Sequence, residues 1–582
     1  MFRKTIVLLV LACLVLSACG GPGTAPPEEG AAEEEVAEEV TTEEETEESE
    51  IVEITILAES IPAGLDTDGP TISVPSTQEG MTQLVEPLIR YARKGVNDDG
   101  VGLLDYESFE PALAESWEFD EDTLTWTFYL RKDVVGCDGR TFTADDVIYT
   151  FARGKSLTGQ ATLSWFLPNV ASIDGFDRSV FEGNTELGDE VVKVDDYTVK
   201  IRQSDPNKLF LPVMTMFFMA PLDKETMEAH ATADDPWSHE WNNNNDKPGF
   251  GPYCVESWTK DKEFIVRANP NYYRGKPPID RIVYVKVPES SNRMAALRSG
   301  DAHLVERLTA KQYDALKGEE GVTVAGVTGN ENLFIVMNFK TPPWDDELVR
   351  KAVAFATPYD EIIETAYYGS ATKWNAHMPS TYPAYIKPSV QYEHDPDKAR
   401  ELLAEAGYPN GEGLEEFSES FLLTYPVEKE AELGPVANIL STALRDIGMP
   451  VQLDPQPQAQ YADRMQIKKD LPFGLNDQQK PIVVDCGYAM QLFYVSTEEG
   501  GLNNLINYEN SYFDDLFKQM KVEPDTAKRN EMLAELQEIL HEDLVWGVVA
   551  ERKTQYAFSS DLTGITYYPD NTIRWADLNL EQ

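Results

Sequence analysis

The residue types that most often carry enzyme chemistry are present in this chain, but their spacing assembles no catalytic motif. The six histidines stand at positions 230, 239, 303, 377, 394 and 541 and have no spacing typical of metal ligands. The sequence has no Gly-x-Ser-x-Gly elbow, no His-Glu-x-x-His helix and no EF-hand loop. Acidic pairs such as Asp145-Asp146 fall at predicted helix starts, where they complement the helix dipole. We therefore expect no catalytic residue, no metal site and no cofactor.

Apart from Cys13, which lies inside the apolar run near the N-terminus, the cysteines divide into two groups. Cys19 follows Leu16-Ser17-Ala18 directly, whereas Cys137, Cys254 and Cys486 are spread over the body of the chain. The spacings of these three match no zinc-site pattern. An odd number in an exported protein allows at most one internal disulfide and leaves one thiol free, and the sequence leaves the pairing open.

The first 50 residues have the composition of an export signal and a tether. Residues 1–4 are basic and residues 6–16 are apolar, which is typical of a secretory signal. The Leu-Ser-Ala-Cys ending resembles a bacterial lipobox, so we expect residues 1–18 to be removed and Cys19 to carry the lipid. The alternative is an ordinary signal peptide with an incidental cysteine. Residues 19–50 are rich in glutamate and poor in apolar residues, which predicts an acidic disordered tether.

The strong acidity of the chain excludes one class of partner. Its formal net charge is −52, with 49 basic against 101 acidic residues. Binding to nucleic acid needs clustered lysine and arginine to neutralise phosphates, so we expect no nucleic-acid partner. The acidity does not by itself indicate that a ligand is cationic.

The body from residue 51 alternates predicted strands and helices. Strands are predicted at 51–57, 124–130, 197–203, 263–268, 280–287, 333–339, 449–453, 546–550 and 554–558. Helices are predicted around 83–88, from 144, and at 290–297, 346–356, 395–407, 432–447, 512–520 and 526–541. This alternation favours α/β architecture, and the length requires two or three domains. After the signal no stretch of about 18 apolar residues follows, so we expect no membrane span.

Several motifs resemble, in order, those of the extracellular solute-binding proteins of the dipeptide and oligopeptide type (family 5), which serve ABC importers. The motifs are 111–117 (PALAESW), 125–131 (TWTFYLR), 138–147 (DGRTFTADDV), 249–253 (GFGPY), 268–275 (ANPNYYRG) and 298–301 (RSGD). The resemblance implies a two-lobed periplasmic-binding-protein-like α/β fold with a hinge, and a third subdomain inserted in the first lobe. The implied boundaries are 51–85, 196–328 and 544–582 for the first lobe, 86–195 for the insert and 329–543 for the second lobe.

The resemblance also implies where a ligand would bind. Peptide-binding relatives pair the ligand's amino terminus with a carboxylate on a short strand of the second lobe. The matching stretch here is 480–488 (KPIVVDCGY), so Asp485, flanked by Val484 and Cys486, is the expected anchor. An ammonium that is desolvated in a closed cleft needs such an opposite charge. The alternative is an ordinary aspartate that caps a helix.

Other positions are expected to line the cleft. On the first lobe, Ser76, Thr77 and Gln78 occupy the loop-to-helix position that lends backbone groups to a peptide in relatives, and their alternative role is a helix cap. Tyr461 and Trp165 match cleft-wall aromatics, with a place in the core as the alternative.

We therefore expect a lipid-anchored solute-binding protein of the bacterial cell envelope, outside the cytoplasmic membrane. Its partners would be a peptide, the transmembrane subunits of an ABC importer and the membrane through Cys19, and it would act as a monomer. The alternatives are the same fold binding an oligosaccharide or another solute, or, in a different class, an exported hydrolase or chaperone.

Overall fold

The computed structural model describes residues 51–69, 71–72, 74–157, 165–176, 186–245, 249–477, 480–497 and 501–581. The expected signal peptide, Cys19 and the expected tether therefore lie outside the described residues. Among the helices of the described residues, none is both long and apolar enough to cross a membrane.

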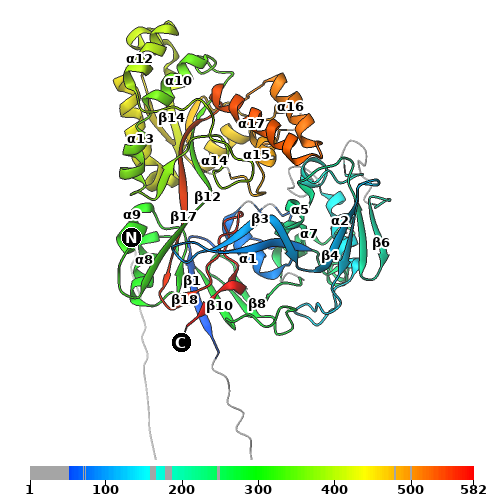
Figure 1. Cartoon of the computed structure of the whole chain (residues 1–582). Coiled ribbons are helices and arrows are strands. Elements are labelled where there is room, and N and C mark those ends of the chain that lie inside the picture. The colour runs from blue at the N-terminus through cyan, green and yellow to red at the C-terminus, as the bar shows by residue number, and fades with distance from the viewer. Residues whose placement is uncertain are drawn as a thin grey trace, which may run out of the picture. The chain divides into compact units, whose positions relative to one another are not determined.

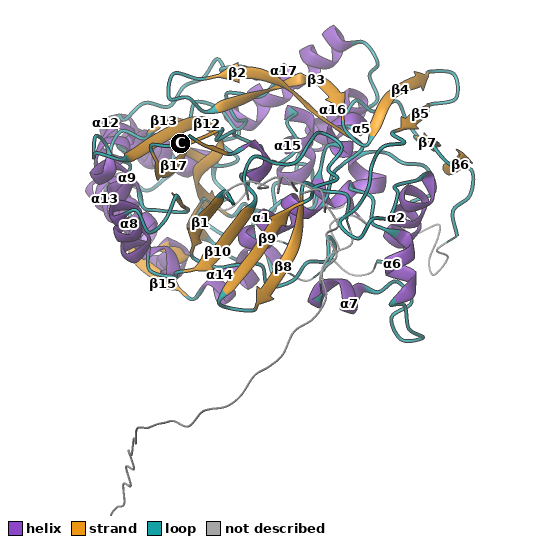
Figure 2. Cartoon of the chain, turned by 90° about the horizontal axis from the view of Figure 1, so that it is seen from below, coloured by secondary structure: helices purple, strands orange, loops and turns teal. Residues whose placement is uncertain are grey.

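The body is organised around one 11-stranded sheet with the strand order β15-β14-β16-β12-β17-β11-β1-β10-β9-β8, and β13 pairs with β17. In the first lobe, β1 pairs in parallel with both β10 and β11, and Figure 2 shows β1, β10, β9 and β8 side by side. The strands of this lobe are β1 Glu53–Ala58, β8 Tyr253–Thr259, β9 Glu263–Ala268, β10 Arg281–Lys286 and β11 Leu304–Val305; its helices are α1 Pro75–Leu84, α8 Ser290–Ser299 and α9 Ala310–Leu316.

Two long strands connect the lobes. β12 (Val322–Met337) and β17 (Gly547–Ser559) pair antiparallel, and in Figure 1 they run together from the lower group of elements into the upper one. Their register shifts between Thr328 and Glu331 and again between Leu333 and Phe334. A bulge increases the local twist and bends a strand, so the first shift, at the expected lobe boundary, is where we place the expected hinge. The sequence predicted two strands where β17 is one.

The second lobe packs helices on the upper part of the sheet. Its own apolar core includes Trp344, which stacks on Phe473 with ring centroids 4.6 Å apart. Its strands are β13 Ala371–Lys373, β14 Leu422–Pro426, β15 Gln452–Gln456 and β16 Phe473–Asn476; its helices are α10 Glu347–Ala356, α12 Pro396–Glu405, α13 Glu430–Asp446, α14 Gln458–Ala462, α15 Cys486–Phe493, α16 Ser511–Lys521 and α17 Thr526–Glu542.

The subdomain that follows α1 contains a hairpin of β2 (Ile89–Val96) and β3 (Gly102–Pro111) and a separate sheet in the order β4-β5-β7-β6. The strands of that sheet are β4 Ala114–Asp120, β5 Thr125–Leu130, β6 Val191–Asp195 and β7 Thr198–Arg202, and α2 Ala144–Ser156 packs beside them. Because β7 pairs with both β5 and β6, this sheet extends past the expected boundary at 195.

Local signals in this subdomain act as the sequence predicts, with one exception nearby. Thr143 caps α2 in a capping box with Asp146, which confirms the predicted helix start. The helix predicted around 83–88 is wrong, because α1 ends at Leu84 and the following segment is extended. Cys137 is joined to Cys254 on β8 by a disulfide, so the subdomain is covalently tied to the first lobe.

Candidate functional site

The candidate site is built around the segment that enters α15. Asp485 is the N-cap of this helix, and its Oδ1 accepts a hydrogen bond from the backbone N–H of Gly487 at 2.7 Å. The same oxygen accepts a second hydrogen bond from the guanidinium of Arg529 on α17, also at 2.7 Å. The alternative role of a helix cap is therefore present in the structure.

The pair between Asp485 and Arg529 is largely removed from solvent. The two side chains are 15% and 8% exposed, respectively. Desolvation lowers the pKa of the Arg529 guanidinium, but the charge and hydrogen bond of Asp485 outweigh it and raise this pKa above its ordinary value. Both hydrogen bonds of the carboxylate use Oδ1, so within the described part of the chain Oδ2 is the atom that could receive a ligand ammonium. Such an ammonium would meet a carboxylate whose charge Arg529 already balances.

The two neighbours of Asp485 are buried. Val484 is 3% exposed and belongs to the apolar core that the first lobe shares with the subdomain. Cys486 is fully buried, and its thiol lies 3.2 Å from the carbonyl oxygen of Pro383. Burial raises the pKa of the Cys486 thiol well above its usual range, so the thiol stays protonated and is a poor nucleophile.

The predicted first-lobe residues lie in the first turn of α1, where their side chains hold the preceding loop. The Ser76 hydroxyl donates to the carbonyl of Ile61 at 3.1 Å, and the Thr77 hydroxyl accepts from the backbone N–H of Ala63 at 3.2 Å. Gln78 donates from Nε2 to the carbonyl of Ile72 at 2.9 Å. The side chains are thus used within the first lobe, and the backbone N–H groups of Thr77 and Gln78 donate to the carbonyl of Val74 at 3.0 and 3.1 Å.

The two predicted aromatics take different places. Tyr461 on α14 is fully buried and donates to the carbonyl of Leu475 at 2.7 Å, so it belongs to the interior of the second lobe in this structure. Trp165 is partly buried on the subdomain and packs edge-on against Phe166, with ring centroids 5.3 Å apart. Of the two, only Trp165 lies next to the contact between the subdomain and the second lobe.

That contact is centred on Asn169, which no pattern in the sequence indicated. Its carbonyl oxygen accepts from Gln491 Nε2 on α15 at 2.8 Å and from Lys521 Nζ on α16 at 2.7 Å. Beside it, Phe166 meets Tyr488 on α15 with ring centroids 5.7 Å apart. The second lobe therefore touches the subdomain directly, through the same helix that Asp485 caps.

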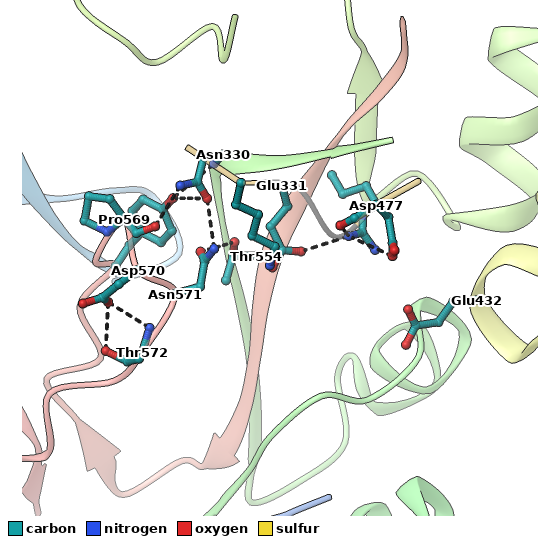
Figure 3. Close-up of polar contacts among 12 residues, drawn as sticks. Asn330, Glu331, Glu432, Asp477, Thr554, Pro569, Asp570, Asn571 and Thr572 are labelled. Carbon is teal, nitrogen blue, oxygen red and sulfur yellow. Dashed lines mark hydrogen bonds and ion pairs between the residues drawn. The ribbon is translucent and has the colours of Figure 1, made fainter. Parts of the chain in front are cut away.

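A buried asparagine joins the lobes on the hinge side. Asn330 on β12 is fully buried, and its Nδ2 donates to the carbonyls of Pro481 and Pro569, each at 2.8 Å. Its Oδ1 accepts from Tyr567 at 3.1 Å and from Asn571 at 2.9 Å. Figure 3 shows this side chain directed at the C-terminal segment that carries Pro569 and Asn571. One side chain thus ties the 480–485 segment of the second lobe to the C-terminal segment.

An ion-pair network lies next to Asn330 (Figure 3). Glu331 pairs with Lys480 and lies 3.6 Å from Arg552. Arg552 also lies 3.2 Å from Asp477, which pairs with Lys429 at 2.8 Å. We call these residues, with Glu432 at 3.6 Å from Lys429, the hinge network.

The charges of the hinge network are mutually stabilised. Desolvation raises the pKa of Glu331, but Lys480 and Arg552 outweigh it and lower this pKa to about 2. Desolvation likewise raises the pKa of Asp477, but Lys429 and Arg552 lower it to about 2. Both acids therefore stay ionised at neutral pH. Sequence reasoning missed this network because its members come from four separated segments.

In the part of the chain that the structure describes, no group of three or more histidine, cysteine, aspartate or glutamate residues could hold a metal ion. The six histidines are likewise dispersed, and only His377 and His541 contact each other, with ring centroids 5.4 Å apart in the core of the second lobe. Asp485, Asn330 and the hinge network place charged and polar groups at a junction between the lobes, where such groups can bind a ligand.

Comparison with known proteins identifies this architecture. Residues 108–500 match the family model for bacterial extracellular solute-binding proteins, family 5. The heme-binding protein A of Haemophilus influenzae is 28% identical over 76% of this chain and 78% of its own length. The dipeptide-binding protein of Escherichia coli is 25% identical over 81% of this chain and 86% of its own length. These relatives are named for binding and not for catalysis.

Solved structures agree on the fold. The periplasmic binding protein DppA of Helicobacter pylori, in complex with a peptide, superposes with a TM-score of 0.72 at 23% identity and covers 91% of this chain and 98% of its own. The dipeptide-binding protein of a Pseudoalteromonas species gives a TM-score of 0.73 at 22% identity, over 91% and 100% of the two chains. The predicted two-lobed α/β fold is confirmed, and so is the prediction that this is not an enzyme. The chain belongs to the bacterial extracellular solute-binding proteins of family 5.

Proposed function

We propose that this protein captures a solute, a peptide in the first instance, between its two lobes and presents the closed form to the transmembrane subunits of an ABC importer. The observation that carries the proposal is the direct contact of α15 with the subdomain at Asn169, next to the helix cap at Asp485. A ligand held between the lobes would add to this contact and stabilise closure, since a ligand shifts an equilibrium by its differential affinity. Relatives named for dipeptides and for glutathione support a peptide as the solute.

Within this proposal the predicted site residues keep defined roles. Asp485 would receive the ligand ammonium through Oδ2, because Oδ1 accepts both of its hydrogen bonds. The first turn of α1, with Ser76, Thr77 and Gln78, would face an extended ligand from the first lobe. Trp165 would contribute apolar surface to the wall. Tyr461, Val484 and Cys486, which are buried, would support the wall from behind.

The proposal is tested on the purified body, residues 51–582. Native mass spectrometry identifies what co-purifies, and calorimetry measures binding of trialanine, maltotriose and heme in parallel. Binding of trialanine with the peptide recovered intact supports peptide import. Preference for maltotriose or heme reassigns the solute within the same fold, and release of a cleaved product refutes the transport role.

We further propose that Cys19 is lipidated and anchors the protein outside the cytoplasmic membrane, with residues 19–50 as the tether and a monomer as the working unit. One acyl chain binds a membrane only marginally, whereas two or more give a lasting anchor. Labelling with a palmitate analogue in a bacterial host should mark the native chain and not Cys19→Ser. Equal labelling, or equal release of both chains into the soluble fraction, contradicts the anchor.

A further inference from the structure

The β2–β3 hairpin reaches from the subdomain to the expected hinge. Its two strands pair with register shifts at two places, and such shifts bend a hairpin. The turn between the strands, residues 97–101, contacts β12 at Gly326, and Figure 1 shows β3 running from the subdomain toward β12 and β17. Gly326 lies two residues before Thr328, where the register of β12 and β17 shifts. The hairpin therefore meets the first-lobe end of the segment that we expect to bend.

Two side chains of the hairpin turn bind the backbone of Gly326. Asn97 Nδ2 donates to the carbonyl of Gly326 at 2.8 Å, and Asp99 Oδ2 accepts from the N–H of Gly326 at 3.1 Å. Asn97 Oδ1 accepts from the backbone N–H groups of Asp99 and Val101, at 3.1 and 2.8 Å, so the turn itself holds both side chains in place. An amide donor and a carboxylate acceptor thus serve the two polar groups of one glycine.

These side chains supply partners that the sheet does not. Gly326 lies opposite Gln555 of β17, and in an antiparallel pair alternate residues direct both polar groups away from the partner strand. Among the described strands, β16 covers the other edge of β12 from Phe334 to Met337 and does not reach Gly326. Gly326 is buried, where an N–H or a C=O without a partner is costly. The hairpin turn therefore takes the place of a neighbouring strand at this point of β12.

The same hairpin supports β12 a second time, through the C-terminal segment. Gly102 forms two backbone hydrogen bonds with that segment, of 2.8 and 3.0 Å. Tyr567 of the segment packs so closely on Gly329 that a β-carbon there would lie 2.3 Å from the tyrosine hydroxyl oxygen. The same hydroxyl accepts from the N–H of Asn330 at 3.1 Å. The hairpin turn thus holds β12 at Gly326, and a segment bound to the hairpin holds it at Gly329 and Asn330.

A strand that is held at two points so close together has little freedom to bend. Val327 and Thr328 are the residues between Gly326 and Gly329. Backbone that is released gains conformational entropy, so a longer free segment would give the open form more conformations and favour it over the closed form. The contact at Gly326 joins the subdomain to the first lobe, which a disulfide also ties together, so the contact can persist when the second lobe moves. The hairpin turn therefore restricts the open form without opposing closure.

We propose that Asn97 and Asp99 are positioning residues for lobe closure, which confine the bend of β12 to the few residues after Gly326 and so favour the closed, solute-binding form. This rests on the proposed function and deepens it, because it names a control of closure that lies outside the ligand site. Apparent affinity falls when the form that binds the solute is less populated. Loss of this contact should therefore weaken the binding of different solutes by the same factor and leave the preference among them unchanged.

The test uses substitutions that keep the shape of the turn. Asn97→Asp keeps the oxygen that organises the turn but replaces the donor to the carbonyl of Gly326 with a negative charge, whereas Asp99→Asn keeps an oxygen that can accept from the N–H of Gly326. The control Asn271→Asp adds the same charge at an exposed turn of the first lobe. Asn97→Asp should bind trialanine about fivefold more weakly than the native protein, the low end of couplings between distant sites. Asp99→Asn and the control should bind it as the native protein does.

Two measurements separate closure from the ligand site and from stability. Calorimetry with trialanine and N-acetyl-trialanine should give the native ratio of affinities in Asn97→Asp, although both affinities fall. Pulsed electron paramagnetic resonance measures the distance between spin labels at Lys262→Cys in the first lobe and Glu401→Cys in the second, which are exposed positions, whereas the free thiol of Cys486 is buried. Without ligand, the distance distribution should be broader in Asn97→Asp than in the native protein, and saturating trialanine should restore the native closed distance.

Native affinity and a native distance distribution in Asn97→Asp overturn the inference and leave peptide binding intact, even if the variant is less stable. A changed ratio of the two peptides, or an equal loss in Asp99→Asn or in the control, overturns it as well. A native protein that binds neither peptide contradicts the peptide proposal instead, and the ligand-free distance distributions then decide. A broader distribution in Asn97→Asp than in the native protein and the control supports the inference, and equal distributions overturn it.

Discussion

Breaking the ion pair between Asp485 and Arg529 should lower the stability of the protein and raise its affinity for a ligand ammonium. Replacing Arg529 with methionine removes the ion-pair partner that Asp485 has among the described residues and keeps most of the apolar volume. Removing one partner of a fully buried pair costs about 3–5 kcal/mol, because the other charge is left uncompensated. Since Asp485 is 15% exposed, water can solvate it in part, and we expect a loss of about 2–3 kcal/mol in the free energy of unfolding.

Ligand binding should change in the other direction. In Arg529→Met the Asp485 carboxylate is no longer balanced within the chain, so its attraction for a ligand ammonium increases. The ratio of affinities for trialanine and N-acetyl-trialanine, which lacks the ammonium, should therefore rise by about tenfold. In Asp485→Ala the difference in binding free energy between trialanine and N-acetyl-trialanine should shrink by about 2 kcal/mol, the low end of the range for truncating one partner of a charge pair.

The assays are urea unfolding and calorimetry at pH 7, applied to Arg529→Met, Asp485→Asn and the double variant. Asparagine keeps the cap of α15, so Asp485→Asn isolates the charge. The double variant should be more stable than the sum of the single losses predicts, because neither charge is then left alone. If Arg529→Met leaves the trialanine ratio unchanged while Asp485→Asn lowers it, the two residues are not coupled and the reasoning fails. If neither variant changes the ratio, Asp485 does not anchor an ammonium.

Three further predictions follow from the same structure. The disulfide between Cys137 and Cys254 closes a loop of 117 residues, so replacing both cysteines with serine should lower the free energy of unfolding by about 3–5 kcal/mol relative to the oxidised native chain. Urea titration measures this loss, and the native chain under reducing conditions should show the same loss. Equal stability of the oxidised and the reduced native chain would contradict the prediction. Burial lowers the pKa of His541 to about 4, so between pH 6.5 and 4 the unfolded chain binds a proton at this residue that the folded chain does not, and stability is lost as the pH falls through this window, by about 3 kcal/mol at most for this group. Burial also lowers the pKa of His377 well below its usual range, so His541→Gln should reduce the acid-induced loss and the double variant with His377→Gln should remove more of it. Asn330→Ala leaves two carbonyls and two hydrogen-bond donors without their buried partner, so the lobes should separate more easily. Small-angle scattering should then give a larger radius of gyration. An unchanged scattering profile would show that Asn330 does not hold the lobes together.

Local signals in the sequence predicted much of the fold. The helices predicted from 144, at 395–407 and at 290–297 are present, and their caps are Thr143, Asp395 and Gly300, because a cap uses only groups within a few residues. The motifs identified the family for a related reason, because the turns that they form depend on short stretches of the chain such as 249–253. Where Gly251 stands, a β-carbon would lie 2.4 Å from the carbonyl carbon of Leu84, so this close approach excludes a larger residue.

The site was harder to predict, because its contacts join segments that are far apart in the chain. Asp485 does follow buried residues, but the short strand expected there is an irregular segment that enters α15. Its partner Arg529 lies 44 residues away and carries no local signal. Lys480 was named only as the first residue of the stretch 480–488, although it pairs with Glu331 across 149 residues. Such pairs depend on how the lobes pack, and no periodicity or capping rule reports that packing.

The acidity of the whole chain and the charge preference of the candidate site act over different distances. The net charge of −52 is spread over the whole chain, and at physiological ionic strength its field is screened within about 8 Å. A charged ligand group in contact with a side chain of the site lies inside that distance, where at an effective dielectric of about 20 one charge pair at 4 Å is worth about 4 kcal/mol. The acidic surface therefore sets solubility and long-range behaviour, while a single side chain such as Asp485 would set the charge preference of the site. For this reason composition excluded nucleic acid but could not decide the charge of the solute.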